Sequence, residues 1–97
     1  MTEDLTAADY RAMSLEMTNL AAEHRDCARR TSLGFDRALL LEQARDYERA
    51  SRLLGAAASA DDPTRLLVAL GAMQPRIAER AAELITVAEV QRTLGGV

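Results

Sequence analysis

The stretch Phe35–Ala58, FDRALLLEQARDYERASRLLGAAA, spreads its apolar residues over more of a helix than an ordinary surface helix does. At about 100° per residue, one line along the helix carries Leu40, Ala44, Tyr47, Ser51, Leu54 and Ala58. Leu41 lies to one side of that line, and the other side carries Phe35, Leu39, Ala50, Leu53 and Ala57. Because so wide an apolar arc needs a neighbour on each flank, we predict the middle helix of a bundle.

A second helix is predicted before it, over residues 6–31. Thr6 is a suitable N-cap, and Asp9, three residues on, completes an acidic variant of the capping box. The residues that follow repeat at alternating steps of three and four, the spacing of a heptad seam: Tyr10, Met13, Met17, Leu20, His24, Cys27 and Thr31. Gly34, in a left-handed conformation, is expected to end this helix. Asp36 then begins the middle helix, over residues 36–58.

A third helix is predicted over residues 63–94, with Asp62 as its N-cap and Pro63 at its first position. Its apolar residues keep one helical phase: Leu66, Leu67, Leu70, Met73, Ile77, Ala81, Leu84, Ile85 and Ala88. Pro75 interrupts this run without shifting its register, so the first interpretation is one helix kinked at Pro75. The alternative is two helices that meet near Gln74.

These helices predict an all-α fold, an antiparallel bundle of three long helices, or of four if the kink at Pro75 is a break. Residues 1–97 make a single helical-bundle domain. Large side chains are scarce, with one Phe, two Tyr and no Trp against nineteen Ala. Alanine favours helix but fills little volume, which predicts thin, closely packed helices or a core that a second chain completes.

The composition of the chain argues against several functions and cellular locations. The net charge is −3 and the chain is lysine-free, which argues against non-specific nucleic-acid binding, because that needs a basic face. No run of eighteen apolar residues occurs and Met1–Ala12 is acidic, so neither a membrane span nor a signal peptide is expected. The single cysteine, Cys27, excludes an internal disulfide and fits a reducing compartment. We expect a cytoplasmic protein.

His24 and Cys27, the single histidine and the single cysteine, lie three residues apart on one face of the first helix. Two such ligands at this spacing are compatible with a metal ion, but a structural zinc site needs four ligands, and the sequence has no second histidine or cysteine. A Cys–His enzyme would also need an orienting group and an oxyanion site. We therefore interpret both residues as members of the core seam, and expect no metal, no cofactor and no catalytic residue.

Histidine phosphotransfer domains, also helical bundles, carry a histidine followed closely by a lysine and a glycine, with a second glycine ten residues on. His24, followed by Leu33-Gly34, resembles that motif. The resemblance implies a phosphate-accepting His24. The chain departs from the pattern, because Cys27 replaces the lysine, Ala28 replaces the first glycine, and the seam directs His24 toward the core.

Arg45-Asp46-Tyr47-Glu48-Arg49 resembles the Arg-Asp-x-Asp-Arg segment of the small all-helical chorismate mutases, which are three-helix chains of about this length that work as intertwined dimers. The resemblance implies that Asp46 and Arg49 match family positions. Arginines around a dicarboxylate carry that chemistry, and Arg11, Arg25 and Arg29 line one flank of the first helix. The family's active-site lysine is missing, and Ala50 stands in place of its glutamate.

Because no complete catalytic set is present, we expect a small non-catalytic module that interacts with another protein. Adaptors, chaperones and accessory proteins of phages or mobile elements share this profile. The middle helix has more apolar surface than two thin neighbours can cover, so a homo-oligomer, most simply a homodimer, is also expected. The candidate interface residues lie on the flank expected to stay open: Phe35, Leu39 and Leu53. A helical mutase and a histidine phosphotransfer domain remain the alternatives.

Overall fold

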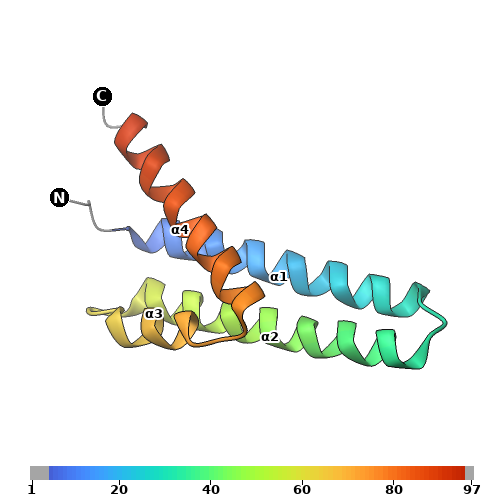
Figure 1. Ribbon diagram of the computed structural model, residues 1–97. Coiled ribbons are helices and arrows are strands. Elements are labelled where there is room, and N and C mark those ends of the chain that lie inside the picture. Colours follow the sequence, from blue (N-terminus) through green and yellow to red (C-terminus); the bar gives the residue numbers. More distant parts are fainter. Residues whose placement is uncertain (1–4, 96–97) are drawn as a thin grey trace.

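The computed structural model describes residues 5–95 of the protein. Within that range the chain forms four helices and no strand: α1 (Ala7–Arg30), α2 (Gly34–Ser59), α3 (Thr64–Gly71) and α4 (Pro75–Gly95). Figure 1 shows α1 and α2 as a long antiparallel hairpin, with α3 returning along α2 and α4 crossing the hairpin obliquely. The predicted all-α, bundle-like fold is confirmed.

The capping box predicted at the start of α1 is present. The Thr6 backbone N–H donates to Asp9 Oδ2 at 2.8 Å, and the Asp9 N–H donates to Thr6 Oγ1 at 3.2 Å. Arg92 of α4 reaches the same group, with its Nη2 2.5 Å from Asp9 Oδ2 and 3.2 Å from Thr6 Oγ1. One short polar cluster therefore both begins α1 and holds the far end of α4 against it.

This cluster gives the protein a testable acid sensitivity. The pKa of Asp9 lies below its usual value, first because its carboxylate accepts the Thr6 backbone N–H and also because it faces Arg92, while partial burial opposes the shift. Because the pKa of Asp9 is lower in the folded chain than in the unfolded chain, its ionised carboxylate stabilises the fold at pH values above the unfolded pKa, about 3.9. This contribution to the free energy of unfolding disappears as the pH falls through the folded-state pKa. We expect the free energy of unfolding to fall in that range.

The check is urea unfolding followed by circular dichroism between neutral pH and pH 2. In Asp9→Asn, the acid-dependent loss of stability should be smaller than in the unchanged chain. Gln91→Asn is the control, since Gln91 is exposed on α4 beside Arg92 and the change leaves every carboxylate in place, so the slope should stay the same. An acid slope that survives Asp9→Asn at full size would contradict the assignment.

α2 begins two residues earlier than predicted. Leu33 is its N-cap and Gly34 is already helical, so Asp36 lies within the first turn, where its charge favours the positive end of the helix dipole. No described glycine has a positive φ, so the left-handed Gly34 was wrong; α1 ends instead at an extended Thr31. From Gly34 the helix continues unbroken through Arg45 and Asp46 to Ser59.

Small side chains allow α1 and α2 to pack closely. Ala21, Ala28 and Ala44 are each at most 1% exposed. Ser14 of α1 and Ser51 of α2 exchange hydrogen bonds, each hydroxyl donating to the other's carbonyl oxygen at 2.8 Å. Thr18 Oγ1 lies 2.8 Å from Ser51 Oγ, so these hydroxyls are satisfied where the two helices meet.

The same packing leaves room at Gly55, a glycine in the interior of α2. A Cβ there would lie 3.5 Å from Ser14 Oγ, an ordinary van der Waals contact. Because glycine costs a helix interior about 0.8–1 kcal/mol relative to alanine, Gly55→Ala is expected to raise the free energy of unfolding by several tenths of a kcal/mol or more. Chemical denaturation measures the change, and a loss of stability would show that this approach of α1 and α2 tolerates no added methyl group.

The single helix predicted over residues 63–94 is wrong, and the alternative of two helices near Gln74 is confirmed. α3 closes with hydrogen bonds from the Ala72 and Met73 N–H groups to the carbonyls of residues 68–70. The Gln74 carbonyl then accepts the first bonds of α4, from Ile77 N at 2.9 Å and Ala78 N at 3.0 Å. Pro75 takes the first position of α4, where its missing N–H costs nothing.

The start of α3 also differs slightly from the prediction. Pro63 is the N-cap and Thr64 the first helical residue, so Asp62 stands one residue further out. Its Oδ1 accepts the Thr64 hydroxyl at 2.6 Å and the Thr64 N–H at 3.1 Å, and these bonds lower the pKa of Asp62. Asp62 therefore still stabilises the first turn.

The core lies in the half of the molecule where α3 and α4 cover the hairpin. Its buried members are Tyr10, Met13, Met17, Ala21, Tyr47, Ala50, Leu54, Ala57, Leu70, Ile77 and Ala81. The other half of the hairpin extends beyond α3 and α4 as two helices alone (Figure 1). The radius of gyration is accordingly 14.7 Å, against about 12.5 Å for a compact domain of this length.

Candidate protein-binding face

The uncovered half of the hairpin exposes the side that α3 and α4 cover elsewhere. On α2, Phe35 and Leu39 lie on the same helical stripe as Ala50 and Leu53. Ala50 is fully buried and Leu53 packs against the core, whereas Phe35 is 81% exposed and Leu39 is 44% exposed. This side of α2 therefore carries two apolar groups, one covered and one uncovered, with Glu42 and Asp46 between them.

The heptad seam of α1 is interrupted in the same way. Met13 and Met17 are buried, but His24 is only half-buried and Cys27 is exposed. The prediction that Cys27 belongs to the core is therefore wrong, because no helix packs over the second half of the seam. We use the name open face for the uncovered residues of both helices: His24, Cys27, Thr31, Phe35 and Leu39.

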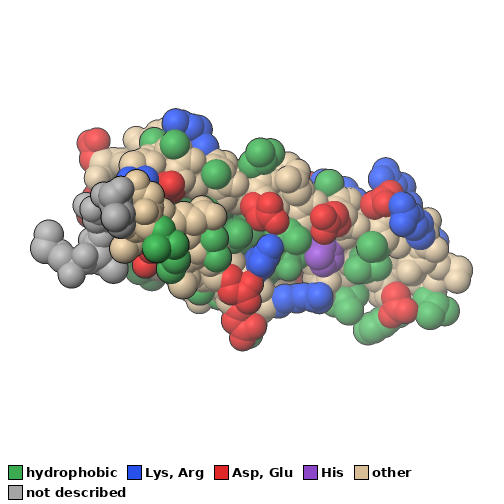
Figure 2. All heavy atoms as spheres, turned by 90° about the horizontal axis from the view of Figure 1, so that it is seen from above, with side chains coloured by type: hydrophobic (Ala, Val, Ile, Leu, Met, Phe, Trp, Pro, Cys, Tyr) green, Lys and Arg blue, Asp and Glu red, His purple; other side chains and the backbone are tan. Residues whose placement is uncertain are grey.

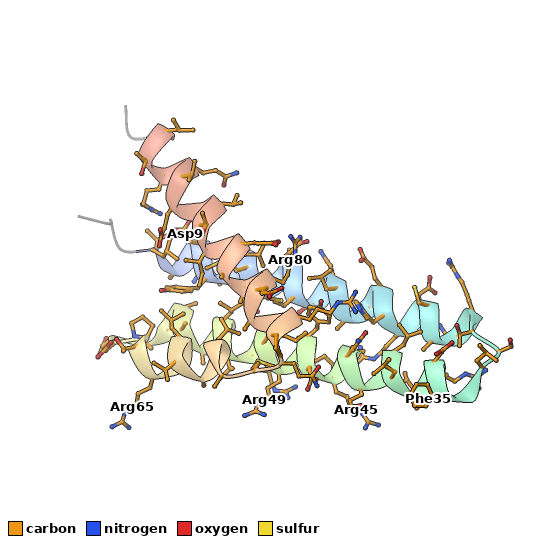
Figure 3. The ribbon with its side chains drawn as sticks, in the orientation of Figure 1. Asp9, Phe35, Arg45, Arg49, Arg65 and Arg80 are labelled. Atoms are coloured by element: carbon orange, nitrogen blue, oxygen red, sulfur yellow. The ribbon has the colours of Figure 1, made fainter. Side chains whose placement is uncertain are left out.

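The figures show this side of the molecule. Figure 3 places Phe35 near the hairpin turn, far from α4. In Figure 2, apolar side chains gather between the histidine and the end of the molecule away from the termini. Leu33 in the turn, which is 65% exposed, adds to this apolar surface. Large apolar side chains grouped in this way on a small domain mark an interaction surface.

His24 is fixed within the open face. Its Nδ1 lies 2.8 Å from the carbonyl oxygen of Leu20, and its ring centroid lies 4.8 Å from that of Tyr47. Both contacts orient the imidazole along the hairpin. No group of three or more potential metal ligands occurs among residues 5–95, and the open face thus offers a ring and a thiol without further ligands.

Ion pairs lie in the same half of the hairpin, on other sides of its two helices. Arg25 of α1 pairs with Glu48 of α2 across the hairpin, and Asp26 bonds to Arg29 at 3.1 Å and to Arg30 at 2.7 Å. Residues 20–49 contain six arginines and six acidic residues, so this half of the hairpin has no net charge although the chain carries −3. A protein that binds this half of the hairpin therefore need not be strongly charged.

The structure brings together two of the three candidate interface residues. Phe35 and Leu39 are neighbours on one turn of α2, whereas Leu53 is half-buried against the core beneath α3 and α4. Sequence reasoning missed Leu33, and it missed an exposed strip on α4 formed by Val87, Val90 and Leu94, which are 51–70% exposed. Their i, i+3, i+7 spacing was the available signal.

The arginines of the mutase-like segment do not gather around a cavity. Arg45 and Arg49 are exposed and point away from α4 in Figure 3. Arg11 and Arg29 are exposed on α1, and Arg25 pairs with Glu48. Asp46 is half-buried, and its Oδ2 has no hydrogen-bond partner within residues 5–95. A dicarboxylate substrate would therefore not meet converging cations in this chain.

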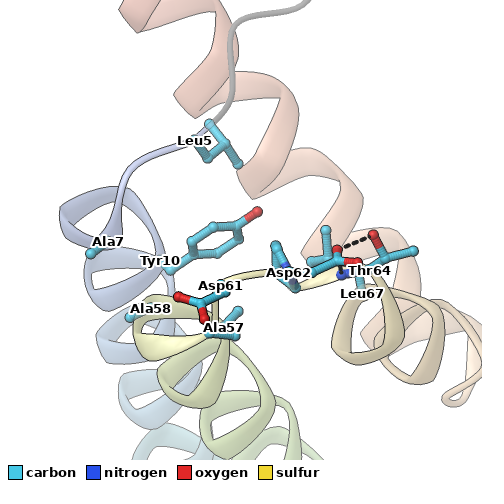
Figure 4. Close-up of a pocket in the computed structure, with 11 residues that line it drawn as sticks. Leu5, Ala7, Tyr10, Ala57, Ala58, Asp61, Asp62, Thr64 and Leu67 are labelled. Atoms are coloured by element: carbon cyan, nitrogen blue, oxygen red, sulfur yellow. Dashed lines mark hydrogen bonds between the residues drawn. The ribbon is translucent and has the colours of Figure 1, made fainter.

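A cavity of about 430 Å³ lies at the opposite end of the molecule from the open face. Figure 4 shows it between the start of α1 and the loop from α2 to α3, with Tyr10, Leu67 and Asp61 in its lining. Its lining contains no histidine, cysteine or arginine, and Asp62 is bonded to Thr64. The cavity lacks the paired nucleophile and base that covalent catalysis needs.

Comparison with known proteins places the chain in no family. No family model matches it, and neither a curated protein nor a solved structure is significantly similar to it. Across residues 5–95, no helix has the length and apolar character needed to cross a membrane.

Proposed function

We propose that the protein is a non-catalytic, cytoplasmic helical module that binds another protein through the open face. The observation that carries the proposal is the 81% exposure of Phe35, the single phenylalanine, on the α2 stripe that α3 and α4 cover elsewhere. Leaving this side chain in water forgoes about 1.5–3 kcal/mol that its burial would contribute. A partner that covers it gains that free energy.

The shape of the open face favours a helical partner. α3 and α4 already cover the first half of the hairpin with helices, and the uncovered half carries apolar residues on the same sides of α1 and α2. An amphipathic helix could cover these residues in the same way, with apolar anchors three and four residues apart. Phe35 and Leu39, one turn apart, would supply the central contacts, where the binding energy of an interface concentrates.

The test compares matched surface variants. Phe35→Ala combined with Leu39→Ala should weaken binding of the partner by at least about tenfold, since a tenfold change needs only about 1.4 kcal/mol. The control is Val90→Ala with Leu94→Ala, which removes a similarly exposed apolar pair from α4. Circular dichroism should show the same helix content for both variants.

The measurement is quantitative affinity capture from the source cell, followed by titration with the purified partner. Loss of binding in the Phe35/Leu39 variant and retention in the α4 variant support the proposal. Equal binding by both variants would reject the open face as the binding site. Turnover of chorismate that is lost in Arg49→Ala would reject the non-catalytic assignment.

A further inference from the structure

We propose that a second copy of the chain occupies the open face, so that two hairpins pack antiparallel about a two-fold axis and form a four-helix bundle. This inference rests on the proposed function and names the partner of the same face. In such an isologous interface each residue meets the same patch of the other copy, and Phe35 and Leu39 of both copies are buried together.

The chain exposes enough area for a standard protein interface. The chain exposes 6545 Å², whereas a compact monomer of 10.6 kDa exposes about 5,500 Å². The excess of about 1,000 Å² exceeds the roughly 800 Å² that each partner buries in a standard interface. In the two-helix half of the hairpin, the exposed apolar side chains include Leu33, Phe35 and Leu39.

The sides of α1 and α2 that α3 and α4 cover in the first half indicate how the second copy would lie on the other half. The seam of α1 continues from the buried Met17 through His24 to the exposed Cys27. On α2, the exposed Phe35 and Leu39 lie on the same side of the helix as the buried Ala50, and the polar residues Glu42 and Asp46 lie between them. Two helix pairs whose apolar seams lie uncovered bury them by packing against each other, as the halves of a four-helix bundle do. Each hairpin would then cover the open face of the other, as α3 and α4 cover the first half of their own hairpin.

The distribution of charge favours an interface in this half of the hairpin and an antiparallel arrangement of the two copies. Residues 20–49 are neutral, so the whole net charge of −3 lies elsewhere, and two copies joined through their open faces keep these like charges apart. Within this half, residues 26–37 around the turn carry a net +1, and the remaining residues carry −1. An antiparallel arrangement places the turn of one copy beside the oppositely charged segment of the other.

Cys27 provides a direct probe, because it is exposed in one copy and lies in the middle of the open face between His24 and Thr31. Its alkylation by iodoacetamide should slow by at least about tenfold as the protein concentration rises through the dimerisation range found by sedimentation equilibrium. The control is Cys27→Ser combined with Ala22→Cys, since Ala22 is exposed on the other side of α1. The thiol at position 22 should react at a rate independent of concentration.

The surface variants complete the experiment. Phe35→Ala with Leu39→Ala should raise the dimer dissociation constant by at least about tenfold, and Val90→Ala with Leu94→Ala should leave it unchanged. A dimer that only the α4 variant weakens, or one that protects position 22 and leaves Cys27 reactive, would overturn the proposal.

A protein that sediments as a monomer at its highest soluble concentration would also overturn it. The proposed function has a separate outcome: if that monomer captures a different protein in a Phe35-dependent way, the open face binds a partner but not a second copy. If capture does not depend on Phe35 either, both proposals fail.

Discussion

Replacing Ile77 by alanine is expected to lower the free energy of unfolding by about 2–5 kcal/mol, the cost of removing a fully buried isoleucine side chain. Ile77 has no exposed surface, and Ala81 is the other buried residue of α4. Besides these two, the partly buried Leu84 and Ile85 pack against the core, so Ile77 is the largest fully buried side chain that attaches α4 to the hairpin. Small domains have a total stability of about 5–15 kcal/mol, so this one change removes a large share.

Urea unfolding followed by circular dichroism measures this effect. Val90→Ala is the matched control, since Val90 lies on the same helix and is 51% exposed; it should change the stability by no more than about 0.5 kcal/mol. Hydrogen exchange should show that amide protection in α4 falls more than protection in α1. A cost below about 1 kcal/mol for Ile77→Ala would mean that α4 is held elsewhere, for example by the contacts of Arg80 with Glu16 and Arg92 with Asp9.

The second large effect comes from enlarging a small core residue. Ala50 has no exposed surface and belongs to the cluster that joins α2 to α3 and α4. In Ala50→Leu, three added carbon atoms have no space unless these helices separate, and such overpacking costs about 1–3 kcal/mol. For a domain of this length, each kcal/mol lowers Tm by about 4–8 °C.

A comparison of the Tm values of Ala50→Leu and Ala56→Leu distinguishes the effect of packing from the effect of helix propensity. Ala56 lies on the same helix and is exposed, so the leucine there should change Tm by only a few degrees. A fall in Tm confined to Ala50→Leu would support close packing by small residues. A rise would reveal unfilled space between α2 and the two helices that cover it.

Local patterns in the sequence were sufficient for most of the secondary structure. The capping pair Thr6 and Asp9, the apolar period of α2, and the boundary before Thr64 all depend on residues within a few positions of each other. The break before Pro75 was harder to predict, because the apolar residues on its two sides keep a common helical phase. The choice between a kink and a turn depends on which carbonyls the N–H groups of Ala72 and Met73 meet, and the tertiary structure decides this.

The candidate site was predictable only in part. The wide apolar arc identified Phe35 and Leu39 as residues in need of cover, and the structure leaves both exposed. Leu53 lies on the same stripe, and no local pattern distinguished it from Phe35, because the difference arises from where α3 and α4 pack. The same applies to Cys27 and Met13, which hold equivalent positions two heptads apart in one seam but differ in burial.

The sequence by itself determined that this protein is helical, where most of its helices begin and end, and which side of each helix is apolar, because these properties follow from interactions between residues close together in the chain. The tertiary structure alone decided along which part of each helix the apolar side is covered by other helices. α4 crosses the hairpin obliquely, so its buried residues reach only one half of α1 and α2. That crossing depends on contacts between distant segments, and it is what leaves the open face uncovered.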